Sequence, residues 1–412
     1  MQKILFKNID VPDARSLDTY KSRGGYAALK KALSLPPEKL ISMVEESGLR
    51  GRGGAGFPAG IKWKFLPKDR NRTIYLICNA DEGEPGTFKD RHIMEFDPHL
   101  LIEGMTITAY AIGAHHGFIY IRGEYNWIAK LLMSAIIEAV TEGFVGYNIL
   151  NSGFSFYIDV FRGAGSYVCG EETALMESIE GKAGRPRLKP PFPATFGLYG
   201  ESTVIHNVST LSCVPFIIEK GPEAFSKIGK PRSHGTKLFG ISGHVNKPGL
   251  YEYPMGTPLR KLIYEAAGGV RGGKRLKAVI PGGLSSPILT ADEIDVEMDF
   301  DSLLSIGSML GSGGIIVMDE DTSIPMIAQK TAKFFAHESC GQCTPCREGT
   351  NMIKFLIDRI IAGKGGHTDL EQILRLCRYI KGSTICAFGA AAAMPLNAMI
   401  KKFRGEFEAL VR

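Results

Sequence analysis

Four cysteines near the C-terminal end of the chain have the spacing of a redox centre. Cys340, Cys343 and Cys346 follow one another as C-x2-C-x2-C, and Cys386 comes forty residues later. A compact turn with a fourth thiol from a distant segment forms the ligand set of a 4Fe-4S cluster. Zinc also accepts four thiolates, but structural zinc sites usually pair two C-x2-C knuckles. Thr344-Pro345 predicts a helix start whose amides would face an anionic cluster, which favours iron and sulfur.

The other four cysteines carry a weaker signal. Cys78, Cys213 and Cys377 lie in apolar patterns that are typical of buried core thiols. Cys169 lies in a glycine-rich loop, and its role stays open at this point. Eight cysteines in 412 residues do not indicate a disulfide scaffold, so we expect a reducing compartment.

A glycine-rich segment has the composition of a phosphate-binding loop. Residues 51–56 read Gly-Arg-Gly-Gly-Ala-Gly, and such a density of glycine lets backbone amides approach an anion closely. Arg52 and Lys62 add positive charge. The match to G-x-G-x-x-G is loose because no strand leads into it. Interleaved aromatic residues argue against the alternative of a mobile surface loop: Phe57, Trp63 and Phe65.

An acidic segment follows an apolar run. Asp81, Glu82 and Glu84 place three carboxylates within four residues, directly after the run 74–78 and Asn79. A solvated acidic turn is the plain alternative. The position favours a site, because α/β proteins bind ligands at the carboxyl ends of their strands. Carboxylates there can accept hydrogen bonds from ribose hydroxyls, a carboxamide or a flavin ring.

A second glycine-containing loop spans residues 162–175 and reads Arg-Gly-Ala-Gly-Ser-Tyr-Val-Cys-Gly-Glu-Glu-Thr-Ala-Leu. It joins a predicted strand to a predicted helix, with Glu171 and Glu172 in the first helical turn. Acids at that position are also favoured by the helix dipole. Ordinary capping is therefore the alternative to ligand binding.

The elements that must position these residues alternate between strand and helix. Apolar runs predict strands at 74–78, 117–121 and 154–161. Helices are predicted from the N-cap Asp97 and Pro98 to Ala111, where Gly113 ends the pattern, then over 126–141 and from about Glu171. This alternation predicts a Rossmann-like α/β domain with its ligands at the strand ends.

Two further units follow the α/β domain. The proline-rich run 185–193 predicts a rigid loop laid over that domain. From about Lys237, short strands at 238–242, 249–253 and 278–280 surround a helix at 259–267, which predicts a small α+β module. We expect boundaries at 1–232, 233–321 and 322–412.

The last unit is predicted to be helical to the end of the chain. Met352, Phe355, Leu356 and Ile360 are expected to face inward from the helix that begins at Thr344. Thr368-x-x-Glu371 predicts a capping box for the next helix. Its inner face is expected to carry Leu370, Ile373, Leu374, Cys377 and Ile380.

The bulk composition excludes several classes of protein. The net charge of +6, from 49 basic and 43 acidic side chains, does not indicate a nucleic-acid partner. Residues 1–7 contain no apolar core of a signal peptide, and no segment has the apolar length of a membrane span. Any membrane association is therefore expected to come through partners.

Taken together, five motifs resemble the NADH-binding flavoprotein subunits of respiratory complex I, NADH:quinone oxidoreductase. They are G-R-G-G-A-G-F-P, N-A-D-E-G-E-P-G-T-F-K-D-R, G-A-G-S-Y-V-C-G-E-E-T-A-L, K-P-P-F-P and E-S-C-G-Q-C-T-P-C-R-E-G. The resemblance runs from about residue 20 to 405. It implies FMN, NADH and one 4Fe-4S cluster, a β-grasp middle domain that binds soluble ligands, and a helical bundle that holds the cluster.

The resemblance also implies roles for single residues. Glu84 is the candidate catalytic residue, as the acid beside the nicotinamide. The cluster ligands would be Cys340, Cys343, Cys346 and Cys386. FMN would be bound by Gly51, Arg52, Gly53, Gly54, Ala55, Gly56, Lys62, Asn79, Asp81, Glu82, Tyr167, Gly170, Glu171, Glu172, His206 and Asn207. NADH would be bound by Phe57, Phe65, Glu84, Lys189 and Phe192, with the aromatic rings around the adenine.

The chain departs from the family pattern at three places. His206 stands where the family has the first of two Asn residues beside the ribityl phosphate, whereas Asn207 fits. After Cys386 the family has Gly-Asp and later Trp-Pro. Here Ala390 stands in place of that Asp and Met394 in place of that Trp. These differences change the packing around the cluster but no ligand.

The resemblance implies an electron-input enzyme with protein partners. Those partners would be a 2Fe-2S subunit and a larger multi-cluster iron-sulfur subunit, with quinone reached only indirectly. The location implied is the cytoplasmic side of the inner membrane, as a peripheral part of a complex. Two alternatives stay open: the diaphorase subunit of an NAD-linked hydrogenase or formate dehydrogenase, and a zinc-stapled ligand-binding scaffold.

Overall fold

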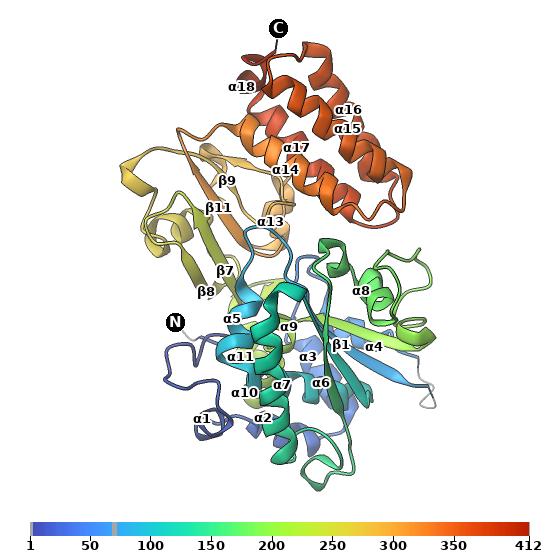
Figure 1. The fold of residues 1–412 in the computed structure, drawn as a ribbon. Coiled ribbons are helices and arrows are strands. Elements are labelled where there is room, and N and C mark those ends of the chain that lie inside the picture. Colours follow the sequence, from blue (N-terminus) through green and yellow to red (C-terminus); the bar gives the residue numbers. More distant parts are fainter. Residues whose placement is uncertain (1–2, 68–71, 412) are drawn as a thin grey trace.

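The computed structural model describes residues 3–67 and 72–411. An α/β domain occupies one end of the molecule, a mixed sheet lies beside it, and a helical bundle lies at the other end (Figure 1). Met1 and Gln2, from the segment considered for a signal peptide, lie outside the described residues.

The α/β domain is built on a four-stranded parallel sheet. Its strands are β1 (Ile74–Ala80), β2 (His116–Ile121), β3 (Tyr157–Arg162) and β4 (Ser202–Asn207), in the order β3-β2-β1-β4. β2 therefore lies on one side of β1, and β4 lies on the other side. Asn79 and Asn207 pair at the carboxyl ends of β1 and β4, so the crevice that follows this change of direction is the expected ligand site.

Helices enclose this sheet and the N-terminal segment. The side chains of α6 (Pro98–Ile112) are nearly all buried, and Gly113, with φ of 74°, ends this helix as predicted. Asp97 is its N-cap residue, but the carboxylate accepts a hydrogen bond from Asn8 Nδ2 at 2.8 Å. The remaining elements of this part are α1 (Leu17–Ser22), α2 (Ala27–Leu33), α3 (Pro37–Glu46), α4 (Ala59–Lys64), α5 (Lys89–Phe96), α7 (Asn126–Thr141), α8 (Glu172–Ile179), α9 (Val208–Leu211), α10 (Val214–Lys220), α11 (Pro222–Ser226), β5 (Gly229–Lys230) and β6 (Ser233–His234).

The proline-rich run forms a loop without helix or strand, as predicted. Arg187 anchors it to the α/β domain, because its guanidinium contacts Glu177 at 2.5 Å, Glu180 at 2.8 Å and the Gly197 carbonyl at 2.8 Å. Lys189 and Phe192 follow in the same loop, and Lys189 contacts Glu171 and Glu172.

The middle unit is a five-stranded mixed sheet in the order β10-β9-β11-β7-β8. Its strands are β7 (Thr236–Gly243), β8 (Gly249–Pro254), β9 (Leu276–Ile280), β10 (Leu289–Thr290) and β11 (Gly314–Asp319). The predicted helix at 259–267 is α12 (Leu259–Lys261) followed by a π-helical turn (Leu262–Ala266). A second short helix, α13 (Phe300–Ser305), precedes β11.

The last unit is the predicted helical bundle. Its helices are α14 (Ile324–Glu338), α15 (Thr344–Ile361), α16 (His367–Gly382), α17 (Phe388–Lys402) and α18 (Arg404–Glu408). The inner face predicted for α16 is buried throughout.

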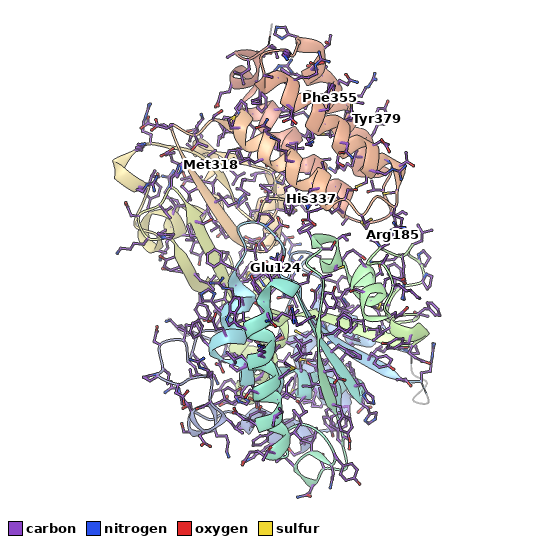
Figure 2. All side chains as sticks on the ribbon, in the orientation of Figure 1. Glu124, Arg185, Met318, His337, Phe355 and Tyr379 are labelled. Atoms are coloured by element: carbon purple, nitrogen blue, oxygen red, sulfur yellow. The ribbon has the colours of Figure 1, made fainter. Side chains whose placement is uncertain are left out.

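Two details of the bundle differ from prediction. Met352 and Phe355 face outward, because Ile353 and Ile357 lie on the inner face of α15 instead; Figure 2 labels Phe355 and Tyr379, which is also exposed. The predicted capping box is wrong. The helix begins one residue before Thr368, and Asp369 caps it by accepting a hydrogen bond from the Gly366 amide at 3.2 Å.

Within the described residues, no helix combines the length and the apolar character that a membrane crossing requires.

Candidate active site

Two adjoining cavities lie where the sheet, the middle unit and the bundle meet. The larger measures about 950 Å³ and the smaller about 260 Å³. Both are lined by residues from the ends of β1 and β4 and from the second glycine-containing loop. The residues common to both are Gly53, Asn79, Gly170, Glu171, Asn207 and Ala387.

The first glycine-rich loop forms one wall of the larger cavity. It is closed by a hydrogen bond from the Gly51 amide to the Phe57 carbonyl at 2.8 Å. Gly56 has φ of +66°, and a Cβ there would lie 2.4 Å from the Phe300 ring, so only glycine fits. This close packing holds the backbone of residues 51–56 against the cavity, as a phosphate-binding loop requires.

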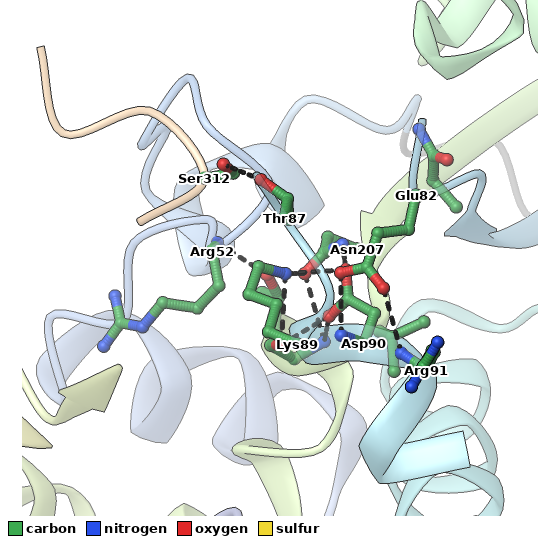
Figure 3. A network of polar contacts seen from close by, with 12 residues as sticks. Arg52, Glu82, Thr87, Lys89, Asp90, Arg91, Asn207 and Ser312 are labelled. Carbon is green, nitrogen blue, oxygen red and sulfur yellow. Dashed lines mark hydrogen bonds and ion pairs between the residues drawn. The ribbon is translucent and has the colours of Figure 1, made fainter. Parts of the chain in front are cut away.

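Arg52 differs from the prediction. Its side chain is completely buried and donates to the carbonyl oxygens of Thr236, Arg50 and His234 at 3.1, 2.8 and 2.6 Å. Figure 3 shows the guanidinium pointing away from the polar network around Lys89. Arg52 lines neither cavity; it ties the glycine loop to the end of β6 and the start of β7, where His234 and Thr236 supply the carbonyl acceptors.

Aromatic side chains surround the outer part of the larger cavity. Phe57, Phe65 and Phe192 all line it and remain about half exposed. The Phe57 and Phe65 ring centroids are 5.9 Å apart. The three rings come from the glycine loop, the end of α4 and the proline-rich loop, and they offer flat apolar surfaces to a planar ligand.

A four-residue ion network also lines the larger cavity. Lys62 Nζ contacts Glu172 at 3.1 Å, and Lys189 Nζ contacts Glu171 and Glu172, both at 2.8 Å. Burial would raise the pKa of Glu172, but the two ammonium groups outweigh it and lower that pKa to about 2. Glu171 also accepts from the Thr173 and Ala174 amides, so the capping alternative is realised alongside its place in the cavity wall.

The acidic segment lines the smaller cavity. Asn79 Nδ2 donates to the Gly170 carbonyl at 2.9 Å, and Asn79 Oδ1 accepts from the Asp81 amide at 3.1 Å. Glu82 accepts from the amides of Asp90 and Arg91 at the start of α5. Burial raises the pKa values of Asp81 and Glu82 to about 7.

One buried oxygen in this cavity wall is left without a partner. Asp81 Oδ2 makes no hydrogen bond within the part of the chain that the structure describes. A buried polar atom in that condition calls for a ligand that supplies a donor. Together with the closely packed glycine loop, it is an observation of this structure that fits a bound polar ring system.

Lys89 and Asp90 were not singled out as site residues from the sequence. Lys89 Nζ contacts Asp90 Oδ2 at 2.6 Å and Asn207 Oδ1 at 3.2 Å, and Asn207 Nδ2 donates to Asp90 at 2.7 Å (Figure 3). Both side chains are almost completely buried, and both residues line the smaller cavity. The sequence did carry a signal for these two residues, because Lys-Asp-Arg continues the acidic motif.

His206 lines the larger cavity beside Asn207. Its Nε2 accepts a hydrogen bond from Trp63 Nε1 at 2.7 Å. Burial, together with the nearby charge of Lys62, lowers the pKa of His206 to about 3. An indole N–H can only donate, so the ring is neutral and its proton is on Nδ1.

Glu84 occupies the far end of the smaller cavity. Its Oε2 accepts from the Tyr167 hydroxyl at 2.6 Å, and its Oε1 accepts from the Ser285 amide at 2.7 Å. Burial raises the pKa of Glu84 above its ordinary value, and these hydrogen bonds oppose the rise. Gly83, next in the same segment, packs against Tyr167.

The four candidate cluster cysteines gather behind this end of the cavity. Cys343 precedes α15, Cys346 lies in its first turn, and Cys386 precedes α17. Cys343, Cys346 and Cys386 pack with Phe335 and Phe388 in one apolar cluster, which Tyr167 also joins. Cys340 packs instead against the group that contains Val168 and Cys169.

The four cysteines offer only sulfur ligands and come from two segments of the chain, as the binding of a four-iron cluster requires. Burial raises the pKa values of the Cys346 and Cys386 thiols to about 11, so binding iron must displace their protons. Among the residues described, no three His, Cys, Asp or Glu side chains converge on a single-ion site.

One short segment joins the cavities to the cysteines. Ala387 lines both cavities and directly follows Cys386, and Phe388 and Ala391 line the smaller one. The cavity wall and the fourth cysteine therefore belong to the same stretch of chain.

Comparison with known proteins agrees with this architecture. Residues 44–216 match the Nuo51 FMN-binding domain, residues 237–317 an SLBB domain, and residues 326–410 the NADH-ubiquinone oxidoreductase-F iron-sulfur binding region. A curated relative, an NADH-quinone oxidoreductase F subunit of Rhizobium meliloti (strain 1021), is 55% identical over 409 residues, which cover 99% of this chain and 97% of the relative.

The chain belongs to the family of NADH-quinone oxidoreductase F subunits. The F subunit of Rickettsia typhi (strain ATCC VR-144 / Wilmington) is 52% identical with the same coverage. Membership of this family confirms the resemblance seen in the motifs, the predicted fold class, and FMN and a 4Fe-4S cluster as the cofactors of this chain. The zinc-stapled scaffold is not supported, since the last region matches an iron-sulfur model.

Solved structures extend the comparison to the fold. The chain aligns over its whole length with one chain of an NAD+-reducing NiFe-hydrogenase in the H2-reduced state, with a TM-score of 0.86 and 36% identity, and covers 67% of that chain. The air-oxidized state of such a hydrogenase gives a TM-score of 0.85 at the same identity. The flavin-binding and cluster-binding parts of this family member are therefore arranged as in that hydrogenase chain.

Proposed function

We propose that this chain is the electron-input subunit of a complex I type NADH:quinone oxidoreductase. It accepts hydride from NADH onto FMN and passes electrons singly to its 4Fe-4S cluster and on toward quinone. The observation that carries the proposal is the shared segment at 386–391, which supplies a cluster cysteine and the wall of the nucleotide cavities. A hydride-accepting site and a one-electron centre would thereby lie next to each other.

FMN, when bound, would supply the chemistry that accepts two electrons together and releases them one at a time. The backbone of residues 51–56 and the Lys62 ammonium would hold its phosphate, with Asn207 oriented by Lys89 and Asp90. Asn79 and Asp81 would bind its ring, the latter through the unpartnered Oδ2. Gly170 and Tyr167 form the facing wall of the smaller cavity.

The outer part of the larger cavity would bind the adenosine half of NADH. Phe57, Phe65 and Phe192 would stack on adenine, with Lys189 nearby. Glu172 is ionised because its pKa is held at about 2, so it would repel a ribose 2′-phosphate and favour NADH over NADPH.

The inner cavity would align the nicotinamide. Glu84 would lie beside that ring, and the apolar cluster of Tyr167, Phe335 and Phe388 would exclude water from the reacting atoms. Hydride transfer needs alignment above all, so no side chain is assigned as an obligatory proton donor.

An anaerobic NADH titration tests the function. The purified chain, alone or with its 2Fe-2S partner, is followed in the visible spectrum as NADH is added. We expect bleaching of a flavin band together with a fall in the broader iron-sulfur absorbance. A protein reconstituted with FMN and iron that ignores NADH would contradict the proposal.

The residue assignments and the unit boundaries are part of this proposal. Boundaries at 1–232, 233–321 and 322–412 are supported by the matched ranges, each of which lies inside one unit. Cys340, Cys343, Cys346 and Cys386 are proposed as the cluster ligands. Arg52 is proposed to act through the shape of the glycine loop, since its charge is turned away.

The partners proposed are a 2Fe-2S subunit and a larger multi-cluster subunit. The chain would then be peripheral to the membrane, on the cytoplasmic side, as part of that assembly. The second candidate is a hydrogenase-type diaphorase, which the likeness to the NAD+-reducing hydrogenase chain favours. Isolation of the native complex separates the two, since quinone-dependent NADH oxidation is expected for the first and hydrogen-dependent NAD+ reduction for the second.

A further inference from the structure

The loop between β9 and β10 brings the middle unit into contact with the acidic segment. The Leu284 amide donates to the Pro85 carbonyl at 3.1 Å, and the Ser285 amide donates to Glu84 Oε1 at 2.7 Å. Gly283 lies against the Glu84 side chain, and a Cβ there would be 2.5 Å from Glu84 Cγ. The tip of this loop therefore has no free space around the carboxylate.

The start of β11 and the loop before it tighten the same contact. A Cβ on Gly314 would lie 2.5 Å from the Gly86 carbonyl oxygen. The Thr87 and Ser312 hydroxyl groups form a hydrogen bond across the boundary. The acidic segment is thus held by the middle unit from Glu84 to Thr87.

The second oxygen of Glu84 is held from a different direction. Its donor, the Tyr167 hydroxyl, belongs to the α/β domain, and the Tyr167 amide donates to Glu338 of α14 at 3.0 Å. The Tyr167 ring packs edge-on against Phe334 and Phe388, with centroid distances of 5.3 and 5.8 Å. Each carboxylate oxygen is therefore oriented by a different part of the fold.

We propose that the middle unit positions Glu84 for the nicotinamide, through the Ser285 amide and the close packing of Gly283. This rests on the proposed function, which places Glu84 beside that ring. Ser285 and Gly283 are positioning residues, because they act on the substrate only through Glu84. A carboxylate with a fixed donor on each oxygen keeps one orientation, whereas a singly held one rotates.

Gly283→Ala tests the proposal by pushing Glu84 out of its place. A displacement of about 1 Å at a reacting site costs up to a hundredfold in rate, so we expect kcat/KM for NADH to fall roughly tenfold to a hundredfold. ADP-ribose, which lacks the nicotinamide, should inhibit as in the wild type, and FMN content should be unchanged. Gly272→Ala is the matched control, since Gly272 also has positive φ, at +68°, with no atoms near its Cβ position.

A double-mutant cycle separates positioning from a general structural effect. In a Glu84→Ala background the clash partner is gone, so Gly283→Ala should cause no further loss. Additive losses, equal weakening of ADP-ribose, or behaviour like Gly272→Ala would each overturn the inference. A wild-type protein that NADH does not reduce would instead contradict the proposed function.

An ester at position 285, introduced as a hydroxy acid, tests the inference where Gly283→Ala fails to fold. It removes only the N–H donor. A lower kcat/KM for NADH with unchanged inhibition by ADP-ribose is again expected. Unchanged NADH kinetics would overturn the proposal.

Discussion

The two ends of the candidate active site are built in different ways. At the outer end, Phe57, Phe65 and Phe192 are about half exposed, and each belongs to a surface loop or a helix end. At the inner end, Glu84 and Tyr167 are enclosed, and donors or aromatic rings from all three parts of the fold contact them. The outer end can bind a nucleotide with local surfaces, whereas the inner end can align a reacting ring because three units determine its geometry.

The largest expected effect comes from the proposed 4Fe-4S cluster, which would take electrons from the inner end of the site. Cys386→Ala removes a proposed ligand, so we expect loss of the iron-sulfur absorbance and a fall of at least about a hundredfold in electron transfer to a one-electron acceptor. NADH should still bleach the flavin, because the nucleotide cavities keep all their other walls. Cys377→Ala, in the bundle core, is the control and should retain the cluster.

Glu84→Gln tests the inner end itself. The amide keeps the size but not the charge or the two-acceptor pattern that Tyr167 and Ser285 require, so we expect kcat/KM for NADH to fall about tenfold to a hundredfold. FMN should stay bound, since its proposed contacts lie elsewhere. Steady-state kinetics and flavin content measure the two effects, with exposed Glu348→Gln as the control. Loss of flavin in the Glu84 variant would remove the distinction between the two ends.

Glu172→Gln tests the outer end through specificity. Neutralising this carboxylate removes repulsion of a ribose 2′-phosphate, so the preference for NADH over NADPH should fall roughly tenfold. The two kcat/KM values, measured in the same preparation, give the ratio. Glu84 lines only the smaller cavity, so Glu84→Gln should leave the ratio unchanged. Equal use of both nucleotides by the wild type would contradict the assignment.

The smallest expected effect concerns His206, on the wall of the larger cavity. Its pKa is about 3 when folded and about 6.5 when unfolded, so the unfolded state binds more protons between these values. Stability is therefore lost as pH falls below 6.5. Between pH 6.5 and 5.5 the free energy of unfolding should fall about 1 kcal/mol more in the wild type than in His206→Asn.

Denaturant titration at the two pH values measures that difference. Fluorescence of Trp63 gives the signal, since this side chain is buried and donates to His206. Trp127→Phe in both proteins removes the second, exposed tryptophan. An identical pH dependence of the two proteins would show that the folded protein accommodates a charged His206.

The prediction from sequence succeeded where neighbours along the chain carry the information. The helix from Pro98 to Ile112 has a proline at its start and a glycine with positive φ at its end. The phosphate-type loop and the C-x2-C-x2-C turn are equally local. These features depend on short-range stereochemistry, which one segment determines by itself.

The prediction failed where the direction of a side chain, or a partner distant in the sequence, decides the contact. The charge of Arg52 indicated an anion contact, but the carbonyl groups of His234 in β6 and Thr236 in β7 bind its guanidinium. Met352 and Phe355 matched a helical period, yet the adjacent positions face the bundle core. Ser285 carried no signal, because it contacts Glu84 only through the fold, 201 residues away in the chain.

The sequence by itself determined the family, the cofactors and many of the residues that line the two cavities, because glycine, acidic and cysteine motifs are specified by residue type and spacing. Tertiary structure alone decided which of those side chains reach the cavities and how Glu84 is oriented. The physical reason is that a buried polar group takes its geometry from the donors and acceptors around it. Here those groups come from segments that only folding brings together.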